Sequence, residues 1–282
     1  MTIEKGLVIV PIVNFVSEDK LIKFDKTLSI RHIDSNTFET LLKRTGDSYL
    51  NLKKGLADVE FVIEKKIAKK AEEIELSLRF GLAYQLFYFN DISDVSLALR
   101  LMKKGDIALP IRFFVSPNFF HVSNTDPVVR DFTELYYLPK KYVSETRRLW
   151  YKLKNVAKER PHLDFSLNQF SRTFHGYDYE NGLVDLMTAF ESIVFSKGKG
   201  APKPYGQVIG IAIGMFLGRN EEERTKIRSD LEEAYSLRNK IVHGHLRDLR
   251  MERANEIDFE LHSNIREYLR ETLRKLIEEV KT

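Results

Sequence analysis

From Lys140 onward, apolar residues recur at helical spacing through almost the whole remainder of the chain. Amphipathic helices of this kind bury their apolar faces by packing against one another. Pro161 marks one clear break in the pattern. The periodicity predicts helices over 140–160, 165–174, 181–195, 205–217, 221–243 and 254–280. Residues 140–282 are therefore expected to form an all-α bundle.

The first 139 residues show a different pattern, in which strand-like and helix-like segments alternate. Some segments alternate apolar and polar residues as half-buried strands do, whereas Asp94 is suited to cap a helix that Gly105 ends. The pattern predicts strands over 6–15, 28–33, 75–89 and 111–115, and helices over 37–43, 59–74 and 94–104. The expected fold class is α+β, with a mixed α/β domain over residues 1–139 and a helical domain over residues 140–282.

Composition excludes several classes of site. The chain has 282 residues, 43% of them apolar, which is enough for two domains with cores. The absence of cysteine excludes disulfides, thiolate metal sites and a thiol nucleophile. The 45 Lys and Arg residues against 41 Asp and Glu residues permit nucleic-acid binding without demanding it. The apolar runs 7–13 and 208–217 are too short for a signal peptide or a membrane span, so we expect a cytoplasmic protein without a membrane partner.

The segment Leu237–His245 lies at the end of a predicted helix, where Gly244 is expected to stop it. Arg238 falls on the apolar face of that helix, and an unpaired cation there would be costly to bury. Asn239 and His243 share a face, but Arg238 and His243 point about 140° apart on an ideal helix. They can converge if the last turn is distorted, if Arg238 curls round, or if a second copy brings its own helix across a dimer interface.

Glu191 is the second candidate site residue. It lies at the edge of an apolar stripe formed by Leu183, Met187, Phe190 and Val194. A carboxylate in this position needs a partner, and Arg238 is the obvious one, through a salt bridge or a charge-assisted hydrogen bond. Such a pair could serve catalysis or could be structural only.

These residues carry a resemblance to a known family. Arg238 and Asn239 followed by His243 resemble the Arg-Asn-x-x-x-His signature of HEPN-domain ribonucleases and toxins. Leu183–Ser192 resembles the first core helix of the ApeA-like HEPN branch, and Glu191 matches a polar position there that faces the motif. Three blocks of the first half resemble the region that precedes the HEPN domain in ApeA-like proteins: Pro11–Phe15, Ser29–Ile33 and Leu97–Asp106.

The resemblance implies a metal-independent endoribonuclease of anti-phage defence, or a toxin, which leaves a 2′,3′-cyclic phosphate and a 5′-hydroxyl. Arg238, Asn239, His243 and Glu191 are then the expected catalytic residues, with no cofactor and no metal. RNA supplies its own 2′-hydroxyl nucleophile, so an imidazole for proton transfer and a guanidinium for phosphate charge would suffice. RNA, a second copy of the chain in a homodimer with a shared centre, and a phage or cellular trigger are the expected partners. The N-terminal region would sense the trigger or present the substrate.

Other functions stay open. The helical half could be a non-catalytic HEPN module that dimerises or binds RNA or another ligand, or it could only assemble an N-terminal half that binds a ligand or a phage component. The basic segment 140–160, with Trp150 and Tyr151, could hold an RNA backbone or be a solvated helix whose aromatic residues face a core. The glycine- and lysine-rich segment 196–206 lacks the spacing of a nucleotide-binding P-loop.

Overall fold

The computed structural model describes residues 3–45, 56, 58–70, 90–124, 135–174, 179–196, 203–243 and 259–281. The chain consists of two compact units, Met1–Trp150 and Tyr151–Thr282. The division falls within helix α6 (Lys140–Glu159), whereas the sequence pattern placed the domain boundary at the start of this segment. Strands occur only in the first unit of the described chain, so the expected α+β class is confirmed.

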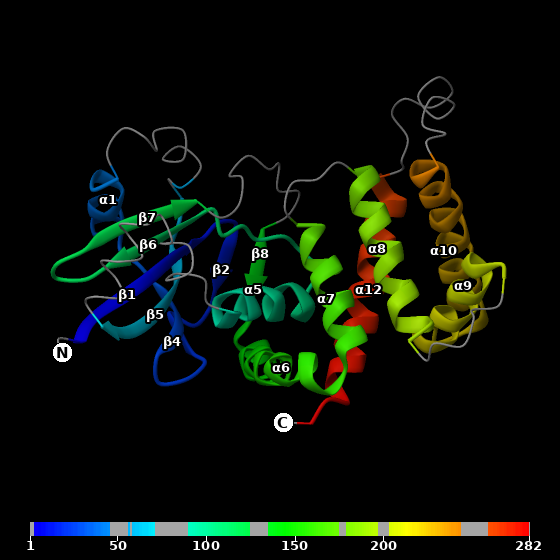
Figure 1. The fold of residues 1–282 in the computed structure, drawn as a ribbon, viewed down its shortest axis with the longest axis horizontal. Helices are drawn as coiled ribbons and strands as arrows, with labels where there is room; N and C mark the ends of the chain where they lie inside the picture. The colour runs from blue at the N-terminus through cyan, green and yellow to red at the C-terminus, as the bar shows by residue number, and fades with distance from the viewer. Residues whose placement is uncertain are drawn as a thin grey trace, which may run out of the picture. The chain divides into compact units, whose positions relative to one another are not determined.

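A six-stranded antiparallel sheet organises the first unit, in the order β3-β4-β5-β1-β6-β7 (Figure 1). Its strands are β1 (Ile3–Ile12), β3 (Leu21–Lys23), β4 (Leu28–His32), β5 (Phe61–Lys70), β6 (Ile111–Val115) and β7 (Phe120–Asn124). A separate parallel pair joins β2 (Phe15–Ser17) to β8 (Tyr136–Leu138). Strand β1 is paired on both sides, and its consecutive residues Val8, Ile9 and Val10 are all buried. A continuous apolar run of this kind is typical of a strand covered on both faces.

Two helices besides α6 belong to this unit. Helix α1 (Ser35–Lys43) is capped by Asp34, whose carboxylate accepts a hydrogen bond from the Thr37 backbone N–H at 2.8 Å. It packs onto the sheet through Phe38, Leu41 and Leu42, which share one apolar cluster with sheet residues. Helix α5 (Asn90–Met102) is tied to the sheet by an ion pair between Lys65 and Asp91.

The predicted helix over 59–74 is wrong for residues 61–70, which form strand β5. Ile63 and Ile67 do keep helical spacing, but β5 is paired with β1 along its whole length and with β4 along half of it. The consecutive residues Phe61, Val62 and Ile63 are all buried, which a helix with one apolar face cannot achieve and a central strand can. Residues 71–74 and the predicted strand over 75–89 lie outside the described residues.

Helix α5 also differs from its prediction. It begins at Asn90, so Asp94 lies inside the helix rather than at its cap. It ends at Met102, two residues before the predicted end, and Gly105 follows with φ of +134°, a conformation that favours glycine. The predicted strands over 28–33 and 111–115 and the predicted helix over 37–43 are confirmed, with small shifts in their ends. The predicted strand over 6–15 is confirmed only as far as Ile12, because Asn14 turns the chain with φ of +61° and Phe15 begins β2 in the separate pair.

Five described helices follow α6 and, with the last part of α6, form the second unit (Figure 1). The sequence predicted all five, although α7 begins at Pro161, four residues before its predicted start, and residues 254–258 of the last predicted helix lie outside the described residues. They are α7 (Pro161–Arg172), α8 (Tyr179–Val194), α9 (Tyr205–Leu217), α10 (Glu221–Val242) and α12 (Phe259–Glu278). Helices α8, α10 and α12 pack against one another, α7 packs against α8 and α12, and α9 lies along α10. None of the described helices has both the length and the apolar character needed to cross a bilayer.

Helix α6 agrees only in part with the two interpretations of its basic sequence, which were a helix that holds an RNA backbone and a solvated helix whose aromatic residues face a core. Trp150 is fully buried and donates a hydrogen bond to the Asp91 carbonyl oxygen at 3.3 Å, whereas Tyr151 is 49% exposed. The ammonium group of Lys152 is buried and donates to the carbonyl oxygens of Glu278 and Val280, at 2.6 and 2.9 Å. Lys152 therefore satisfies carbonyl groups at the C-terminal end of α12 and is not part of a solvated basic face.

His262 is an ionisable group inside the helical unit. It is 5% exposed on α12, and its Nε2 atom is buried without a hydrogen-bond partner. The packing is tight, because a Cβ atom on Gly182 of α8 would lie 2.8 Å from Nε2. Burial lowers the pKa of His262 to about 4, and the charge of Arg266 acts in the same direction.

We predict that His262 makes the helical unit sensitive to acid. Its pKa is about 6.5 in the unfolded chain and lower in the folded one, so the unfolded state binds more protons between these values. Stability should be intact above pH 6.5 and fall by up to about 3 kcal/mol as the pH drops to about 4. His262→Gln, which cannot ionise, should flatten this loss in urea unfolding followed across that range. An equal loss in both proteins would contradict the assignment.

Candidate functional site

Helix α10 presents the Arg-Asn-x-x-x-His motif in its last two turns. The helix begins at the cap residue Asn220, whose side chain accepts a hydrogen bond from the Glu223 backbone N–H at 2.8 Å. Its buried stripe consists of Ile227, Leu231, Ala234 and Tyr235. Arg238 continues that stripe by one turn and is half-buried, so a cation stands where the apolar packing face ends.

Glu191 and Arg238 form the predicted ion pair between α8 and α10. The Glu191 Oε2 atom lies 3.5 Å from the Arg238 Nη2 atom, and the two side chains are 25% and 20% exposed. The carboxylate thus compensates the guanidinium in a partly desolvated setting, where an unpaired charge would be costly. The prediction that these two residues pair is confirmed.

Tyr235 is a third member of this contact, and the sequence analysis missed it. Its hydroxyl donates a hydrogen bond to Glu191 Oε1 at 2.9 Å, while the Arg238 guanidinium carbon lies 5.6 Å from the centre of its ring. Burial raises the pKa of Tyr235 to about 12, and the hydrogen bond and charge of Glu191 add to the effect. The available signal was its position three residues before Arg238, which places both side chains on one helical face.

Asn239 holds the other side of the guanidinium. Its Oδ1 atom accepts a hydrogen bond from Arg238 Nη1 at 3.1 Å. Glu191 and Asn239 therefore fix both terminal nitrogens of Arg238. A guanidinium has five N–H donors, so contacts with two acceptors leave donors for a phosphate.

His243 forms the C-terminal cap of α10 and is exposed. Its backbone N–H donates to the Asn239 carbonyl oxygen at 3.0 Å, which keeps the helical path up to this residue. Its side chain lines an open hollow of about 700 Å³ together with Arg238 and Asn239. Across from α10, the hollow is bounded by the start of α9 and the residues before it, Lys203 to Gln207.

The four predicted site residues therefore fall into two groups. Arg238, Asn239 and His243 line one hollow. The side chains of Arg238 and His243 diverge on an ideal helix, but the hollow is wide and open, so both residues can border it. Glu191 does not line this hollow, and it holds Arg238 in place through their ion pair. His245 lies outside the described residues. Within the described ranges, no group of three or more His, Asp or Glu side chains could hold a metal ion.

No protein-family model, curated protein or solved structure matches this chain.

The residues that line the hollow determine which reactions it can support. Helix α10 contributes a guanidinium, an amide and an imidazole, and the facing segment contributes the ammonium group of Lys203. Glu232 adds one carboxylate. This set of groups can bind a phosphate and transfer a proton.

We predict that Glu191→Gln destabilises the folded protein by about 1–2 kcal/mol, because the half-buried Arg238 loses its counter-charge. Urea unfolding with a constant slope measures the change. Glu232→Gln is the matched control, since it breaks an ion pair with Arg228 that is more exposed, and it should cost at most about 0.5 kcal/mol. Equal effects of the two substitutions would show that the Glu191 contact is no more than a surface pair.

Proposed function

We propose that this protein is an endoribonuclease of the HEPN type, which cuts RNA without a metal ion and leaves a 2′,3′-cyclic phosphate and a 5′-hydroxyl. The observation that carries the proposal is the common hollow lined by Arg238, Asn239 and His243, with the guanidinium held between Glu191 and Asn239. A volume of about 700 Å³ suits a nucleotide-sized ligand.

The reaction needs an imidazole and a guanidinium, which the hollow contains, and water, which can enter because the hollow is open. The 2′-oxygen of the substrate attacks the neighbouring phosphorus, and the bond from phosphorus to the 5′-oxygen breaks. The imidazole of His243 takes the proton from the 2′-hydroxyl or gives one to the departing 5′-oxygen, and solvent water makes the other of these two proton transfers. The guanidinium of Arg238 donates hydrogen bonds to the non-bridging phosphate oxygens, where negative charge grows in the transition state. Asn239 keeps the guanidinium in place.

The packing of the second unit supports the family part of the proposal. The segment that resembles the first HEPN core helix lies on α8, and the motif lies on α10, and these two helices pack together. Glu191, matched to a polar position facing the motif, contacts Arg238. A role in anti-phage defence or as a toxin, with the N-terminal unit sensing a trigger or presenting RNA, belongs to the same proposal.

A second candidate is a non-catalytic HEPN module that dimerises or binds RNA. The observation that favours it is the Tyr235–Glu191–Arg238 contact, which can hold α8 against α10 without any part in a reaction. Under this alternative, Arg238 stabilises the contact between α8 and α10, and His243 is only a helix cap. The two functions differ in what happens when the exposed imidazole of His243 is removed.

We predict that pure protein cleaves RNA in the presence of EDTA and that end-group analysis finds cyclic phosphates. His243→Ala should lower the rate by about 10²–10⁴-fold and Arg238→Ala by about 10²–10³-fold, since one removes proton transfer and the other charge stabilisation. Lys240→Ala is the matched control, because this cation lies on the same turn but does not line the hollow. Cleavage at the parent rate by both variants would refute the assignment. If the protein needs a trigger, toxicity on expression is the corresponding assay.

We further propose that the active centre is shared by two chains, with Arg238 of one and His243 of the other acting on one phosphate, because Arg238 and His243 of one chain point about 140° apart on an ideal helix although both line its hollow. Chains carrying Arg238→Ala and His243→Ala, unfolded and refolded together, should then regain activity, because each mixed dimer keeps one of its two centres intact. A mixture that stays inactive would mean that each chain supplies its own pair or that all four residues are needed. The activity of each variant mixed with the parent chain would then distinguish a pair supplied by one chain from a centre that needs all four residues.

A further inference from the structure

Glu232 lines the hollow of Arg238, Asn239 and His243, called the motif hollow below, and the proposed reaction does not use it. Among the described residues that line the motif hollow, it is the only one with a carboxylate, and its side chain is 33% exposed. A carboxylate repels a phosphate, so phosphate binding does not account for Glu232. A ligand group that donates hydrogen bonds would be a suitable partner for it.

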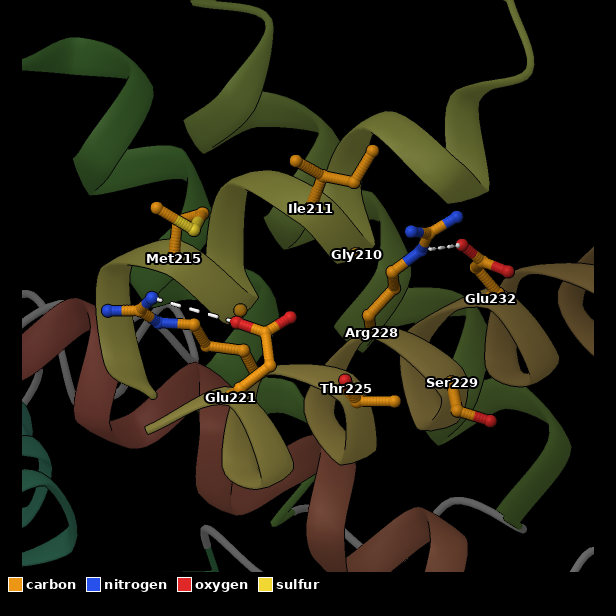
Figure 2. Close-up of a pocket in the computed structure, with 10 residues that line it drawn as sticks. Gly210, Ile211, Met215, Glu221, Thr225, Arg228, Ser229 and Glu232 are labelled. Atoms are coloured by element: carbon orange, nitrogen blue, oxygen red, sulfur yellow. Dashed lines mark hydrogen bonds and ion pairs between the residues drawn. The ribbon is translucent and has the colours of Figure 1, made fainter. Parts of the chain in front are cut away.

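The carboxylate of Glu232 is held by Arg228. Glu232 also lines a second hollow of about 300 Å³, and Arg228 is one of its neighbours there (Figure 2). The Nε atom of Arg228 donates a hydrogen bond to Glu232 Oε1 at 2.7 Å, as a dashed line in Figure 2 marks, and no hydrogen bond from a described residue reaches Oε2. A carboxylate can accept about four hydrogen bonds, so Glu232 is oriented and can still accept others.

Glu232 lies on the same face of α10 as the motif. Four residues that line the motif hollow follow one another at intervals of four, three and four residues: Glu232, Ser236, Asn239 and His243. Side chains at this spacing share one face of a helix. At 1.5 Å per residue, Glu232 is about 10 Å along the helix axis from Asn239. A nucleotide whose phosphate lies at Arg238 and Asn239 can therefore extend its base toward Glu232.

Tyr205 supplies an aromatic ring to the same hollow. It is the first residue of α9, lines the motif hollow and is half-buried. The centre of its ring lies 5.6 Å from that of Phe195 and 6.4 Å from that of Tyr235, so the ring is supported by its neighbours. Tyr235 also lines the hollow but is only 8% exposed, so Tyr205 is the more accessible ring. Proteins recognise unpaired RNA bases by stacking them on aromatic side chains of this kind.

We infer that the part of the motif hollow beside Glu232 is a subsite for guanine, in which Tyr205 stacks on the base and Glu232 accepts hydrogen bonds from its N1–H and N2–H groups. Guanine presents these two donors side by side. Adenine and cytosine place an acceptor next to their amino group, and uracil has one donor between two acceptors. Guanine is therefore the base that gives a carboxylate two parallel hydrogen bonds without a facing acceptor.

The subsite defines a substrate class, which is RNA with a guanosine next to the phosphate that is cut. This statement about cleavage rests on the proposed function. Binding of guanine in the hollow does not, because it needs only the positions of Glu232, Tyr205 and the phosphate-binding groups.

The first test measures binding without cleavage. Titration calorimetry of the parent protein with the 3′- and 5′-monophosphates of the four ribonucleosides should show the tightest binding for guanosine. The preference should be about 5–150-fold, which is the range for one bidentate contact with a base. Equal affinity for the four bases, or no binding of any of them, would overturn the inference.

The second test changes the hydrogen-bonding pattern of the subsite. In Glu232→Gln, the side chain offers one acceptor and one donor, so the preference for guanine should disappear and binding should shift toward adenine and cytosine. Glu233→Gln is the matched control, because it makes the same change at the next residue, which is exposed and does not line the hollow. This control should keep the preference of the parent. A Glu232→Gln protein that still prefers guanine would contradict the role of the carboxylate.

The third test concerns stacking, which does not depend on the identity of the base. Tyr205→Ala should weaken the binding of all four monophosphates by about 5–150-fold, whereas Tyr205→Phe should bind like the parent. If the alanine variant loses its circular dichroism spectrum, Tyr205→Leu replaces it, since leucine fills space without an aromatic ring. Unchanged binding by the folded variant would overturn the role of Tyr205.

Sequencing of cleaved RNA separates the subsite from the proposed function. The parent should cut next to guanosines, and Glu232→Gln should cut at different positions rather than only more slowly. Cleavage without any base preference would overturn the guanine subsite and leave the ribonuclease proposal intact. Selective binding of guanosine monophosphates by a protein that cuts no RNA would refute the ribonuclease proposal alone.

Discussion

The guanidinium of Arg238 on the packing face of α10 is the constraint on which the arrangement of the site depends. A cation in this position has to meet a carboxylate, and Glu191 of α8 supplies it at 3.5 Å. The hydroxyl of Tyr235 binds the other oxygen of Glu191, so both oxygens of the carboxylate are fixed. The otherwise apolar packing of α8 against α10 thereby gains a polar interaction that fixes the register of the two helices. Arg238, held by Glu191 and Asn239, is one of the residues that line an open hollow, and a cation held in place in this way is the preorganisation that phosphate chemistry uses.

The free energies of an ion pair and of an apolar contact indicate why the Glu191–Arg238 pair is present. Both side chains are 20–25% exposed, so solvent weakens their attraction, and a pair of this kind contributes on the order of 1 kcal/mol. Apolar residues of similar size could stabilise the contact between α8 and α10 as well or better. What they could not provide is a positioned cation at the rim of the hollow. The pair is therefore better explained by the orientation of Arg238 than by stability.

The sequence was sufficient for the features that repeat over many residues and insufficient for those set by contacts between distant segments. The helices of the second unit follow from long stretches of 3.6-residue periodicity, and the Glu191–Arg238 pair follows from two charges on apolar faces. Strand β5 was mistaken for a helix because Ile63 and Ile67 fit both periods, and its pairing with β1 and β4 decides the outcome. Tyr235 was missed because a tyrosine in an apolar stripe is usually a core residue, and only the structure brings its hydroxyl to Glu191.

Glycines of α9 connect the site to the outer surface of the same helix. Gly206, Gly210 and Gly214 are spaced four apart and face α10, and a Cβ atom on Gly206 would lie 3.0 Å from the Cβ atom of Tyr235. The lack of side chains lets the two helices approach closely, so α9 buries its small face and turns Ile211 and Met215 outward. The same approach places the start of α9 opposite Arg238, where it forms the far wall of the motif hollow. A bulkier residue at Gly206 would push against Tyr235, which binds Glu191, so the width of the hollow and the hold on Arg238 depend on one close helix contact.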